Sequence, residues 1–389
     1  MVVITLKRGE EKRILLGDPW IYDNEIAKWK GEYEPGDIVE VQDSHGRFIG
    51  RGYVNPHSKI RVRLMTRKRE EVNGAMVKKR IQNAWDYRQL VADPQACRVV
   101  FTEADLLPGL IVDKFGDYLC IQTMSLGIEK FRDDIISALH EIIHPKGIYE
   151  RNDVKVRELE GLTQQTGFIG PEFDTEVAIE ENGLKMVIDI AGGQKTGYFL
   201  DQRENRAAIA PYVKDAYVLD AFTHTGSFAL HAAKYGAKRV KAVDISEHAI
   251  EYVMKNAVLN GFGGMIEGEC ANVFDYLREY NPEEGLFDTI ILDPPAFCKN
   301  RSAITAAYRG YKEINLRAMK LLKPGGFLIT CSCSHYMKPD MFNNMLMDAA
   351  MDAHRTVRQI EYRQQAKDHP VLLGFDESLY LKCFILQVL

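Results

Sequence analysis

Residues Phe287–Phe297 read FDTIILDPPAF, and residues Lys323–Met337 read KPGGFLITCSCSHYM. The first segment contains β-branched and aliphatic residues from Thr289 to Leu292, which predict a buried strand. Asp293 follows this run and precedes two prolines, which cannot continue a sheet ladder and therefore force the backbone into a stiff loop. We expect Asp293 at the carboxyl end of a strand, where open α/β sheets bind their ligands.

The second segment repeats this pattern. Pro324-Gly325-Gly326 predicts a turn, Phe327 to Thr330 predicts a strand, and Cys331-Ser332-Cys333 follows the strand. If the two strands are neighbours, the carboxylate of Asp293 and a thiol face one crevice. We expect this crevice to be the active site.

The composition is that of a globular protein with several domains. The chain has 389 residues, too many for one ordinary core, and its 46% hydrophobic and 27% charged residues are ordinary for a soluble protein. The sequence contains no long uncharged apolar run and begins without the apolar core of a secretion signal, so we expect no membrane association. Seven cysteines without repeated spacing argue against a disulfide framework. These features predict a cytoplasmic protein.

The charge is unevenly distributed along the chain. The net charge is −5, yet residues 1–80 contain 17 Lys and Arg against 12 Asp and Glu. Around the predicted strand Ile60–Leu64, the cations Lys59, Arg61 and Arg63 would share one face, which suits a phosphate backbone. A half-exposed strand with a basic outer face is the alternative. The charge asymmetry favours contact with RNA.

Three domains are predicted. Residues 1–72 contain short alternating strands separated by turn signals, which indicates a small β-rich domain. Residues 73–190 mix helical and extended patterns and predict an α+β domain without a catalytic constellation. Residues 191–389 alternate strands and helices, which predicts a doubly wound, Rossmann-like α/β sheet. Its last two strands, 357–362 and 379–388, are expected to pair antiparallel.

The start of the third domain predicts a nucleoside site. A strand ends at Asp220, the loop after it contains one glycine, Gly226, and the next strand ends at Asp244. An acidic residue 24 positions after Asp220 is well placed for ribose hydroxyls. Because the loop lacks the G-x-G-x-x-G pattern that a pyrophosphate needs, the sequence argues against a nicotinamide enzyme.

A second glycine-containing segment precedes the strand that ends at Asp220. Residues 191–206 read AGGQKTGYFLDQRENR, and Gln194 stands where a phosphate-binding loop requires glycine before Lys195. The segment therefore argues against an NTPase. We expect it to form a loop that caps a pocket before a helix.

Six motifs together resemble a known family. They are Gly17–Tyr22, Gly50–Pro56, Leu107–Asp113, Lys195–Arg203, Asp293–Phe297 and Ser332–Ser334. The carboxyl-terminal half resembles class I S-adenosylmethionine-dependent methyltransferases. The whole chain resembles the large-subunit ribosomal RNA cytosine-carbon-5 methyltransferases that carry an amino-terminal PUA domain. The resemblance implies a PUA-like domain at residues 1–72, a middle domain at 73–190 and a methyltransferase domain at 191–389.

The resemblance also implies the residues that bind S-adenosylmethionine. They are Phe222, Thr223 and Gly226 around the methionine part, Asp244 at the ribose and Asn272 at the adenine, together with Asp220, Lys195, Tyr198, Gln202 and Asp293. The family usually has an aspartate where this chain has Asn272, but an amide oxygen can also accept a hydrogen bond from the adenine amino group. We expect no metal site.

Cys333 and Asp293 match the catalytic pair of the family. Carbon 5 of cytosine is a poor nucleophile, and a thiolate that adds to carbon 6 activates it. The resemblance implies that Cys333 supplies this thiolate and that Asp293 holds the base and shares or supplies a proton at N3. Cys331 is the alternative nucleophile, because Thr330-Cys331-Ser332 resembles a motif of a different group of RNA cytosine methyltransferases. Register within the family favours Cys333.

Two other functions stay open at this point. Methylation of an exocyclic base amine uses similar Asp-Pro-Pro-aromatic loops, but here Ala296 separates the second proline from Phe297, and that chemistry gives Cys333 no role. A non-catalytic RNA-binding assembly factor is the other alternative. The expected partner is ribosomal RNA, namely 23S RNA of the large subunit, and we also consider a homodimer.

Overall fold

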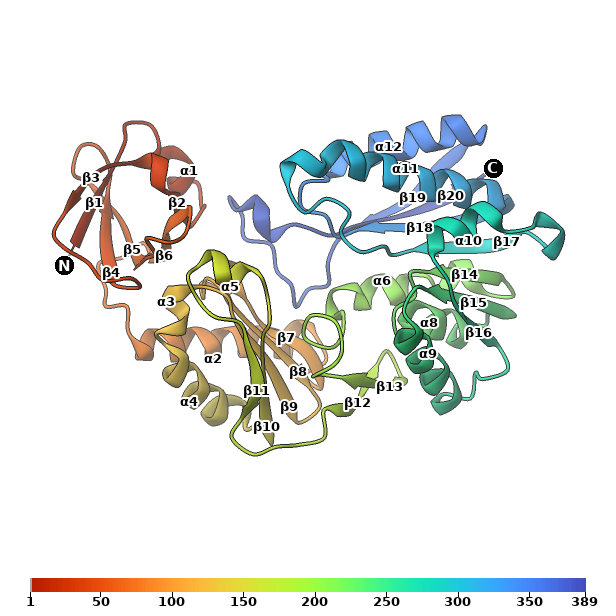
Figure 1. Cartoon of the computed structure of the whole chain (residues 1–389), viewed down its shortest axis with the longest axis horizontal. Helices are drawn as coiled ribbons and strands as arrows, with labels where there is room; N and C mark the ends of the chain where they lie inside the picture. Colours follow the sequence, from red (N-terminus) through yellow and green to blue (C-terminus); the bar gives the residue numbers. More distant parts are fainter. Residues whose placement is uncertain (1) are drawn as a thin grey trace. The chain divides into compact units, whose positions relative to one another are not determined.

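The structure, a computed structural model, describes residues 2–389 (Figure 1). The chain divides into two units. The first unit extends to Val177 and also includes Asp189–Leu200 and Lys367–Ser378. The second unit comprises Ala178–Ile188, Asp201–Ala366 and Leu379–Leu389. None of the helices in this described part combines the length and apolarity that a bilayer span requires.

The first unit begins with a six-stranded sheet within residues 2–66, in the order β2-β6-β5-β4-β1-β3. Its elements are β1 (Val2–Leu6), α1 (Glu11–Leu15), β2 (Trp20–Tyr22), η1 (Asp23–Glu25), β3 (Ile26–Lys30), β4 (Ile38–Gln42), β5 (Phe48–Val54) and β6 (Ile60–Thr66). Alternate residues of β1 are buried, and Ile4, Val39 and Val62 lie in one apolar cluster. The prediction of a small β-rich domain is confirmed.

The prediction that Arg63 belongs to a basic outer face of β6 is wrong. Its side chain is buried, and its guanidinium donates one hydrogen bond of 2.9 Å to each carboxylate oxygen of Glu160. Arg61 pairs with Asp23 at 2.9 Å. A buried cation needs a counter-charge, so Arg63 fixes β6 to the Glu160 segment instead of meeting a phosphate backbone.

A five-stranded sheet follows within residues 96–169, in the order β11-β10-β9-β8-β7. Its elements are α2 (Gly74–Val91), β7 (Ala96–Phe101), η2 (Thr102–Asp105), β8 (Leu110–Phe115), β9 (Tyr118–Thr123), α3 (Leu126–Glu129), α4 (Arg132–Ile143), β10 (Gly147–Asn152), α5 (Val156–Leu159) and β11 (Gln165–Ile169). Val77 and Ile81 of α2 and Leu139 of α4 share one buried cluster with the sheet. The α+β prediction is confirmed.

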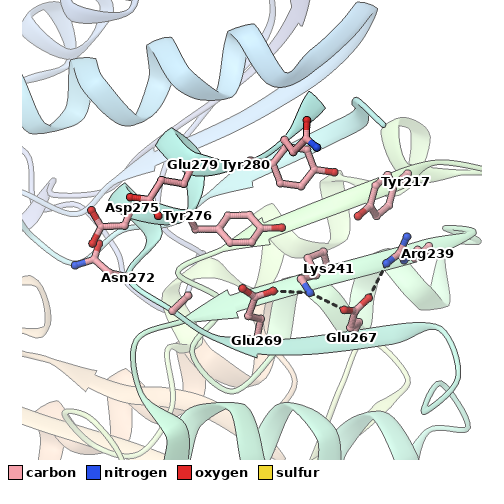
Figure 2. A pocket seen from close by; sticks show the side chains of 12 residues that line it. Tyr217, Arg239, Lys241, Glu267, Glu269, Asn272, Asp275, Tyr276, Glu279 and Tyr280 are labelled. Atoms are coloured by element: carbon pink, nitrogen blue, oxygen red, sulfur yellow. Dashed lines mark hydrogen bonds and ion pairs between the residues drawn. The ribbon is translucent and has the colours of Figure 1, made fainter. Parts of the chain in front are cut away.

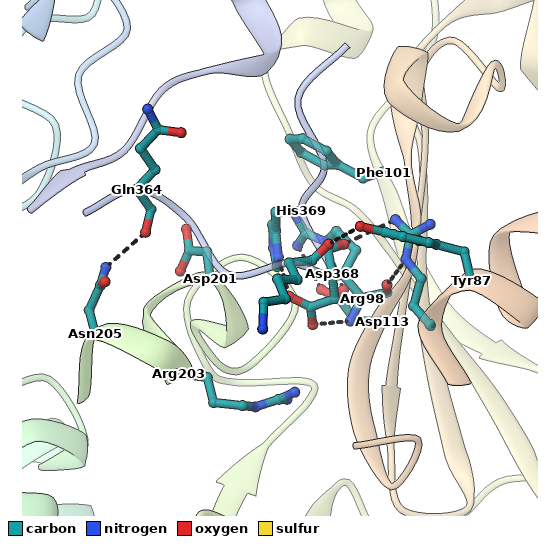
Figure 3. A network of polar contacts seen from close by, with 12 residues as sticks. Tyr87, Arg98, Phe101, Asp113, Asp201, Arg203, Asn205, Gln364, Asp368 and His369 are labelled. Carbon is teal, nitrogen blue, oxygen red and sulfur yellow. Dashed lines mark hydrogen bonds and ion pairs between the residues drawn. The ribbon is translucent and has the colours of Figure 1, made fainter. Parts of the chain in front are cut away.

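Two distant segments are fixed to this sheet by polar contacts, and Figure 3 shows the one that carries Asp368. Asp113 of β8 accepts hydrogen bonds from the Arg98 guanidinium at 2.7 and 2.8 Å and from the Thr196 hydroxyl at 2.6 Å. The carboxylate of Asp368 accepts from the Arg98 backbone N–H at 3.0 Å, and its carbonyl accepts from Arg88. The motifs Leu107–Asp113 and Lys195–Arg203 therefore meet through the pair Asp113–Thr196.

The second unit contains a sheet whose described strands follow the order β16-β15-β14-β17-β18-β20-β19, with β20 antiparallel to both of its neighbours. The strands are β14 (Tyr217–Ala221), β15 (Arg239–Asp244), β16 (Ile266–Cys270), β17 (Phe287–Leu292), β18 (Leu322–Ser332), β19 (Val357–Arg363) and β20 (Lys382–Val388). The order reverses between β14 and β17, which is the ligand-binding position of open α/β sheets. The doubly wound fold and the antiparallel final pair are confirmed.

Helices cover both faces of this sheet (Figure 1). They are α6 (Arg203–Ala208), α7 (Ala210–Val213), α8 (Ser227–Lys234), α9 (Glu247–Leu259), α10 (Val273–Glu279), α11 (Ile304–Leu321) and α12 (Pro339–Ala353). The remaining elements are β12 (Glu176–Glu181) and β13 (Leu184–Asp189), which form a two-stranded sheet, and the 3-10 helices η3 (Leu200–Gln202), η4 (Pro282–Glu284), η5 (Arg301–Ala303) and η6 (Asp376–Ser378).

The turn expected at Pro324-Gly325-Gly326 lies inside β18 as an irregularity. The strand begins at Leu322, which pairs with Phe287, and the next paired residues are Thr289 and Phe327. Gly325 has φ +85°, a left-handed conformation that glycine adopts without a steric penalty. The extra residues are therefore accommodated as a bulge within one long strand.

Candidate active site

The carboxyl ends of β17 and β18 bring Asp293 and Cys333 to one edge of the sheet. The two strands are parallel neighbours, and Leu292 lies opposite Thr330. Asp293 is thus the first residue after β17, and Cys333 is the first residue after β18. The Cys333 Sγ lies 4.0 Å from the carbonyl oxygen of Pro294. The thiol therefore lies against the loop that begins at Asp293.

The three cysteines near this edge differ in exposure. Cys333 is partly exposed, whereas Cys331 is fully buried opposite Cys383 of β20 and Cys298 is 2% exposed. Burial raises the pKa of the Cys331 and Cys298 thiols. Because the thiolate is the reactive form, burial makes these two thiols poor nucleophiles. All seven cysteines lie in the described part of the chain and are free thiols.

Tyr311 of α11 fixes the loop that carries Cys333. Its hydroxyl lies 3.0 Å from the Ser332 hydroxyl and 2.9 Å from the Ser334 hydroxyl. The Ser334 hydroxyl also accepts a hydrogen bond from the Cys298 backbone N–H at 3.0 Å. Both neighbours of Cys333 are therefore held by buried hydrogen bonds, which restricts the position of the thiol.

Gln202 orients the carboxylate of Asp293. Its side-chain amide donates to the Asp293 Oδ1 at 2.8 Å, and its own oxygen accepts from the Asn205 amide at 2.7 Å. Asn205 also donates to the carbonyl of Gln364 at 3.1 Å, as Figure 3 shows. The sequence predicted Gln202 as a cofactor-binding residue, but its contact here is with the proposed catalytic acid.

The loop after β14 has an unusual backbone. Phe222 and His224 have φ angles of +64° and +52°, which residues other than glycine rarely adopt. Gly226 has φ +86° and precedes α8, and an added Cβ there would meet the Val253 side chain at 3.2 Å. Such conformations are costly and are concentrated at ligand-binding sites.

Two carboxylates organise this loop. Asp244 accepts hydrogen bonds from the backbone N–H groups of His224 at 2.9 Å and Ser246 at 3.0 Å. Asp220 is fully buried, and its Oδ2 accepts from the Thr223 hydroxyl and from the Ala229 N–H. Within residues 2–389, the Asp220 Oδ1 is one of the buried side-chain oxygens without a hydrogen-bond partner. A buried oxygen without a hydrogen bond costs free energy. The loop is therefore suited to a ligand that donates a hydrogen bond to this oxygen.

Sequence reasoning missed a cluster of aromatic side chains beside the loop. The ring centroids of Phe274 and Phe297 lie 5.6 Å apart, and each lies 6.3 Å from the ring of Phe222. All three side chains are partly exposed. Partly exposed aromatic rings can stack on a planar base. The aromatic residue after Asp-Pro-Pro was visible in the sequence, but its approach to Phe222 depends on the sheet order.

Asn272 lies at the start of helix α10, two residues before Phe274. Its side-chain oxygen accepts a hydrogen bond from the Phe274 backbone N–H at 2.9 Å and caps α10. A carbonyl oxygen has two lone pairs, so this cap does not prevent the predicted contact with adenine.

Asn272 also borders a pocket of about 410 Å³ (Figure 2). The cations of that pocket are neutralised, because Lys241 pairs with Glu267 and Glu269, and Arg239 pairs with Glu267. The pocket is therefore poorly suited to a phosphate.

Lys195 and Tyr198 belong to the first unit, whereas the other predicted site residues belong to the second. The Lys195 Nζ lies 4.6 Å from the ring centroid of Phe199, and Tyr198 is buried. Their roles at the cofactor stay predictions.

Comparisons with known proteins identify the family. Residues 166–383 match the model of the S-adenosylmethionine-dependent methyltransferases, and residues 4–67 match a PUA-like domain. A ribosomal RNA large subunit methyltransferase I from Alteromonas mediterranea is 40% identical over 99% of this chain and 98% of its own length. The protein of that name from Tolumonas auensis is 42% identical over 99% of both chains. The chain belongs to the family of these ribosomal RNA large subunit methyltransferases. It is an S-adenosylmethionine-dependent methyltransferase.

Solved structures share the fold of this methyltransferase. A proposed SAM-dependent methyltransferase from Streptococcus mutans is 21% identical, with a TM-score of 0.84 over all of both chains. A second structure, of a proposed methyltransferase complexed with SAH, has a TM-score of 0.85 at the same identity and coverage.

The residues at the end of β14 fit the cofactor of this methyltransferase family. S-adenosylmethionine carries an ammonium group and a sulfonium, and both are positively charged. The buried Asp220 oxygen without a protein partner can accept a hydrogen bond from the ammonium group. Asp244 retains lone pairs for ribose hydroxyls, since each of its oxygens accepts one backbone N–H.

We expect the affinity of the methyltransferase for S-adenosylmethionine to depend on pH. Burial raises the pKa of Asp220 to about 7, so its carboxylate is charged above that pH and protonated below it. The cationic cofactor should therefore bind roughly tenfold more weakly at pH 6 than at pH 8. Calorimetric titration measures this, and Asp220→Asn should remove most of the difference. Equal affinity of the wild-type protein at both pH values would contradict the role of Asp220.

Proposed function

We propose that this methyltransferase forms 5-methylcytosine in 23S ribosomal RNA through a covalent bond between Cys333 and the base. The observation that carries the proposal is the position of a partly exposed thiol and an oriented carboxylate at the ends of neighbouring strands. The names of the relatives, ribosomal RNA large subunit methyltransferase I, support the substrate.

The Cys333 thiolate forms a bond to carbon 6 of cytosine, and the electrons of the carbon 5–carbon 6 double bond shift toward N3. The carboxyl group of Asp293 supplies a proton at N3 and thereby stabilises the activated ring. When bound, S-adenosylmethionine supplies an electrophilic methyl group. Carbon 5 takes up this methyl group, and N3 loses its proton. Loss of the carbon 5 proton to a base then restores the double bond and expels the thiolate.

The target base must leave its stack to reach this edge of the sheet. Unstacking costs a few kcal/mol, which partly exposed aromatic rings can offset by stacking on the extruded base. Phe297, which follows the Asp-Pro-Pro segment and is partly exposed, is suited to this role. The amino-terminal sheet, within the matched PUA-like residues 4–67, is proposed to contact the RNA. The homodimer and the cytoplasmic location stay predictions, which sedimentation and cell fractionation test.

The product identifies the reaction. The full chain is incubated with S-adenosylmethionine and large-subunit RNA from cells that lack the gene, and the RNA is digested to nucleosides for mass spectrometry. We expect 5-methylcytidine, and mapping of the fragments locates the modified residue. A methyl group on an exocyclic amine would overturn the proposal. Cofactor binding without any methylated nucleoside, on free RNA and on large-subunit particles, would favour a non-catalytic role.

A further inference from the structure

Lys382 is a buried lysine beside the proposed nucleophile. It is the first residue of β20 and lies opposite Ser332 of β18. Its side chain is only 2% exposed, and its Nζ donates to the carbonyl oxygens of Ser334 and Tyr380, both at 2.7 Å. The antiparallel pairing of β18 and β20 therefore places an ammonium group next to the loop that carries Cys333.

The ammonium of Lys382 has neutral hydrogen-bond partners. A buried charge is costly unless an opposite charge compensates it. Burial lowers the pKa of Lys382 to about 8, and Cys333 and Cys298 act in the opposite direction. Lys338, just before α12, adds to the lowering. The groups with the largest effect on Lys382 include the thiols of Cys333 and Cys298, and of these two only Cys333 is partly exposed. Asp293, which begins the loop that Cys333 contacts, is a carboxylate and opposes a thiolate there, so Lys382 is the cation that can offset it.

We propose that Lys382 is a positioning residue for the methyltransferase reaction, whose buried ammonium is the counter-charge that holds the side chain of Cys333 as a thiolate. The inference rests on the proposed covalent function. The thiolate is needed when the bond to carbon 6 forms and is released again when that bond breaks. If the lysine starts as a neutral amine, the Sγ–H bond breaks and an N–H bond forms. The proton stays within the pair, and no further reactant is needed.

Cys333 differs from Cys298 and Cys331 in its exposure. Those two thiols are buried, whereas Cys333 is partly exposed and lies between the two serines that Tyr311 holds. An ammonium close to a thiol shifts its protonation toward the nucleophilic form, as in other reactive cysteines. The position of Lys382 beside this loop therefore favours reaction of Cys333 near neutral pH.

The test measures the rate of Cys333 alkylation by iodoacetamide between pH 5.5 and 10, with the modified peptides quantified by mass spectrometry. In the wild-type chain, the midpoint of the Cys333 profile is expected at least one pH unit below about 8.5, the ordinary thiol pKa. In Lys382→Met, it is expected to rise by at least one unit, so that Cys333 reacts about tenfold more slowly at pH 7. The exposed thiol of Cys270 serves as an internal standard and should keep its profile.

Lys338→Met is the matched control, because it removes an exposed cation near Lys382 and should leave the Cys333 midpoint within about 0.3 units of the wild type. A wild-type midpoint at or above 8.5 overturns the inference even if Lys382→Met does not fold. An unchanged midpoint in a folded Lys382→Met protein also overturns it. The result is separable from the proposed function, because alkylation requires neither RNA nor methyl transfer, whereas the proposed function fails if no 5-methylcytidine is formed.

Discussion

Replacing Cys333 with alanine is expected to lower the rate of cytosine methylation by at least ~10³-fold, because without the thiolate carbon 5 is not activated. Binding of S-adenosylmethionine, measured by calorimetry, should change little. Cys331→Ala is the matched control, since Cys331 lies two residues away and is fully buried opposite Cys383. It should retain methylation within about tenfold of the wild type. The reverse result, with Cys331 essential and Cys333 dispensable, would assign the nucleophile to Cys331.

A substrate RNA with 5-fluorocytidine at the target position tests the covalent bond itself. Fluorine replaces the proton that must leave carbon 5, so the thiolate cannot be expelled and the adduct should accumulate. Denaturing electrophoresis detects this adduct, and mass spectrometry of its peptides should place the bond on Cys333. Cys333→Ala should give no adduct. Full methylation activity in Cys333→Ala would instead favour transfer to an exocyclic amine, which does not require a thiol.

Replacing Glu181 with alanine is expected to destabilise the second unit by ~3–5 kcal/mol, because it removes the buried carboxylate that pairs with two buried arginines. Glu181 is 1% exposed and accepts hydrogen bonds from Arg206 at 2.6 and 2.9 Å and from Arg203 at 3.5 Å. Both arginines lie on α6, and Gln202, which orients Asp293, immediately precedes this helix. The midpoint of denaturant unfolding measures the loss.

Glu180→Ala is the control for this change, because Glu180 is the exposed neighbour on the same strand, β12. Its effect should stay within about 0.5 kcal/mol, as for ordinary surface substitutions. Equal stability of the Glu180→Ala and Glu181→Ala proteins would show that α6 does not depend on this ion pair. Methylation assays at a temperature where the Glu181→Ala protein is still folded should then show whether Asp293 keeps its orientation.

The sequence predicted the strand ends of the site because these depend on local chemistry. Thr289–Leu292 is a run of β-branched and aliphatic residues, which predicts a buried strand, and the two prolines after Asp293 end it wherever the strand lies in the sheet. The single glycine of the 221–227 loop was recognised in the same way. Its φ of +86° explains why that position requires glycine.

The sequence could not predict which partner neutralises a charged side chain. Arg63 was expected to face a phosphate backbone, but it lies buried against Glu160, 97 residues further along the chain. Alternation along a strand shows which side chains share a face, but it does not show whether another segment covers that face.

The sequence by itself therefore determined the order of strands and helices, the loop composition and the candidate residues at the strand ends, because sterics and periodicity act over a few neighbouring residues. Only the tertiary structure decided that β17 and β18 are neighbours, that Phe274 and Phe297 approach Phe222, and that Lys382 lies beside the loop of Cys333. These contacts join residues separated by tens of positions, and the packing of the whole sheet fixes them.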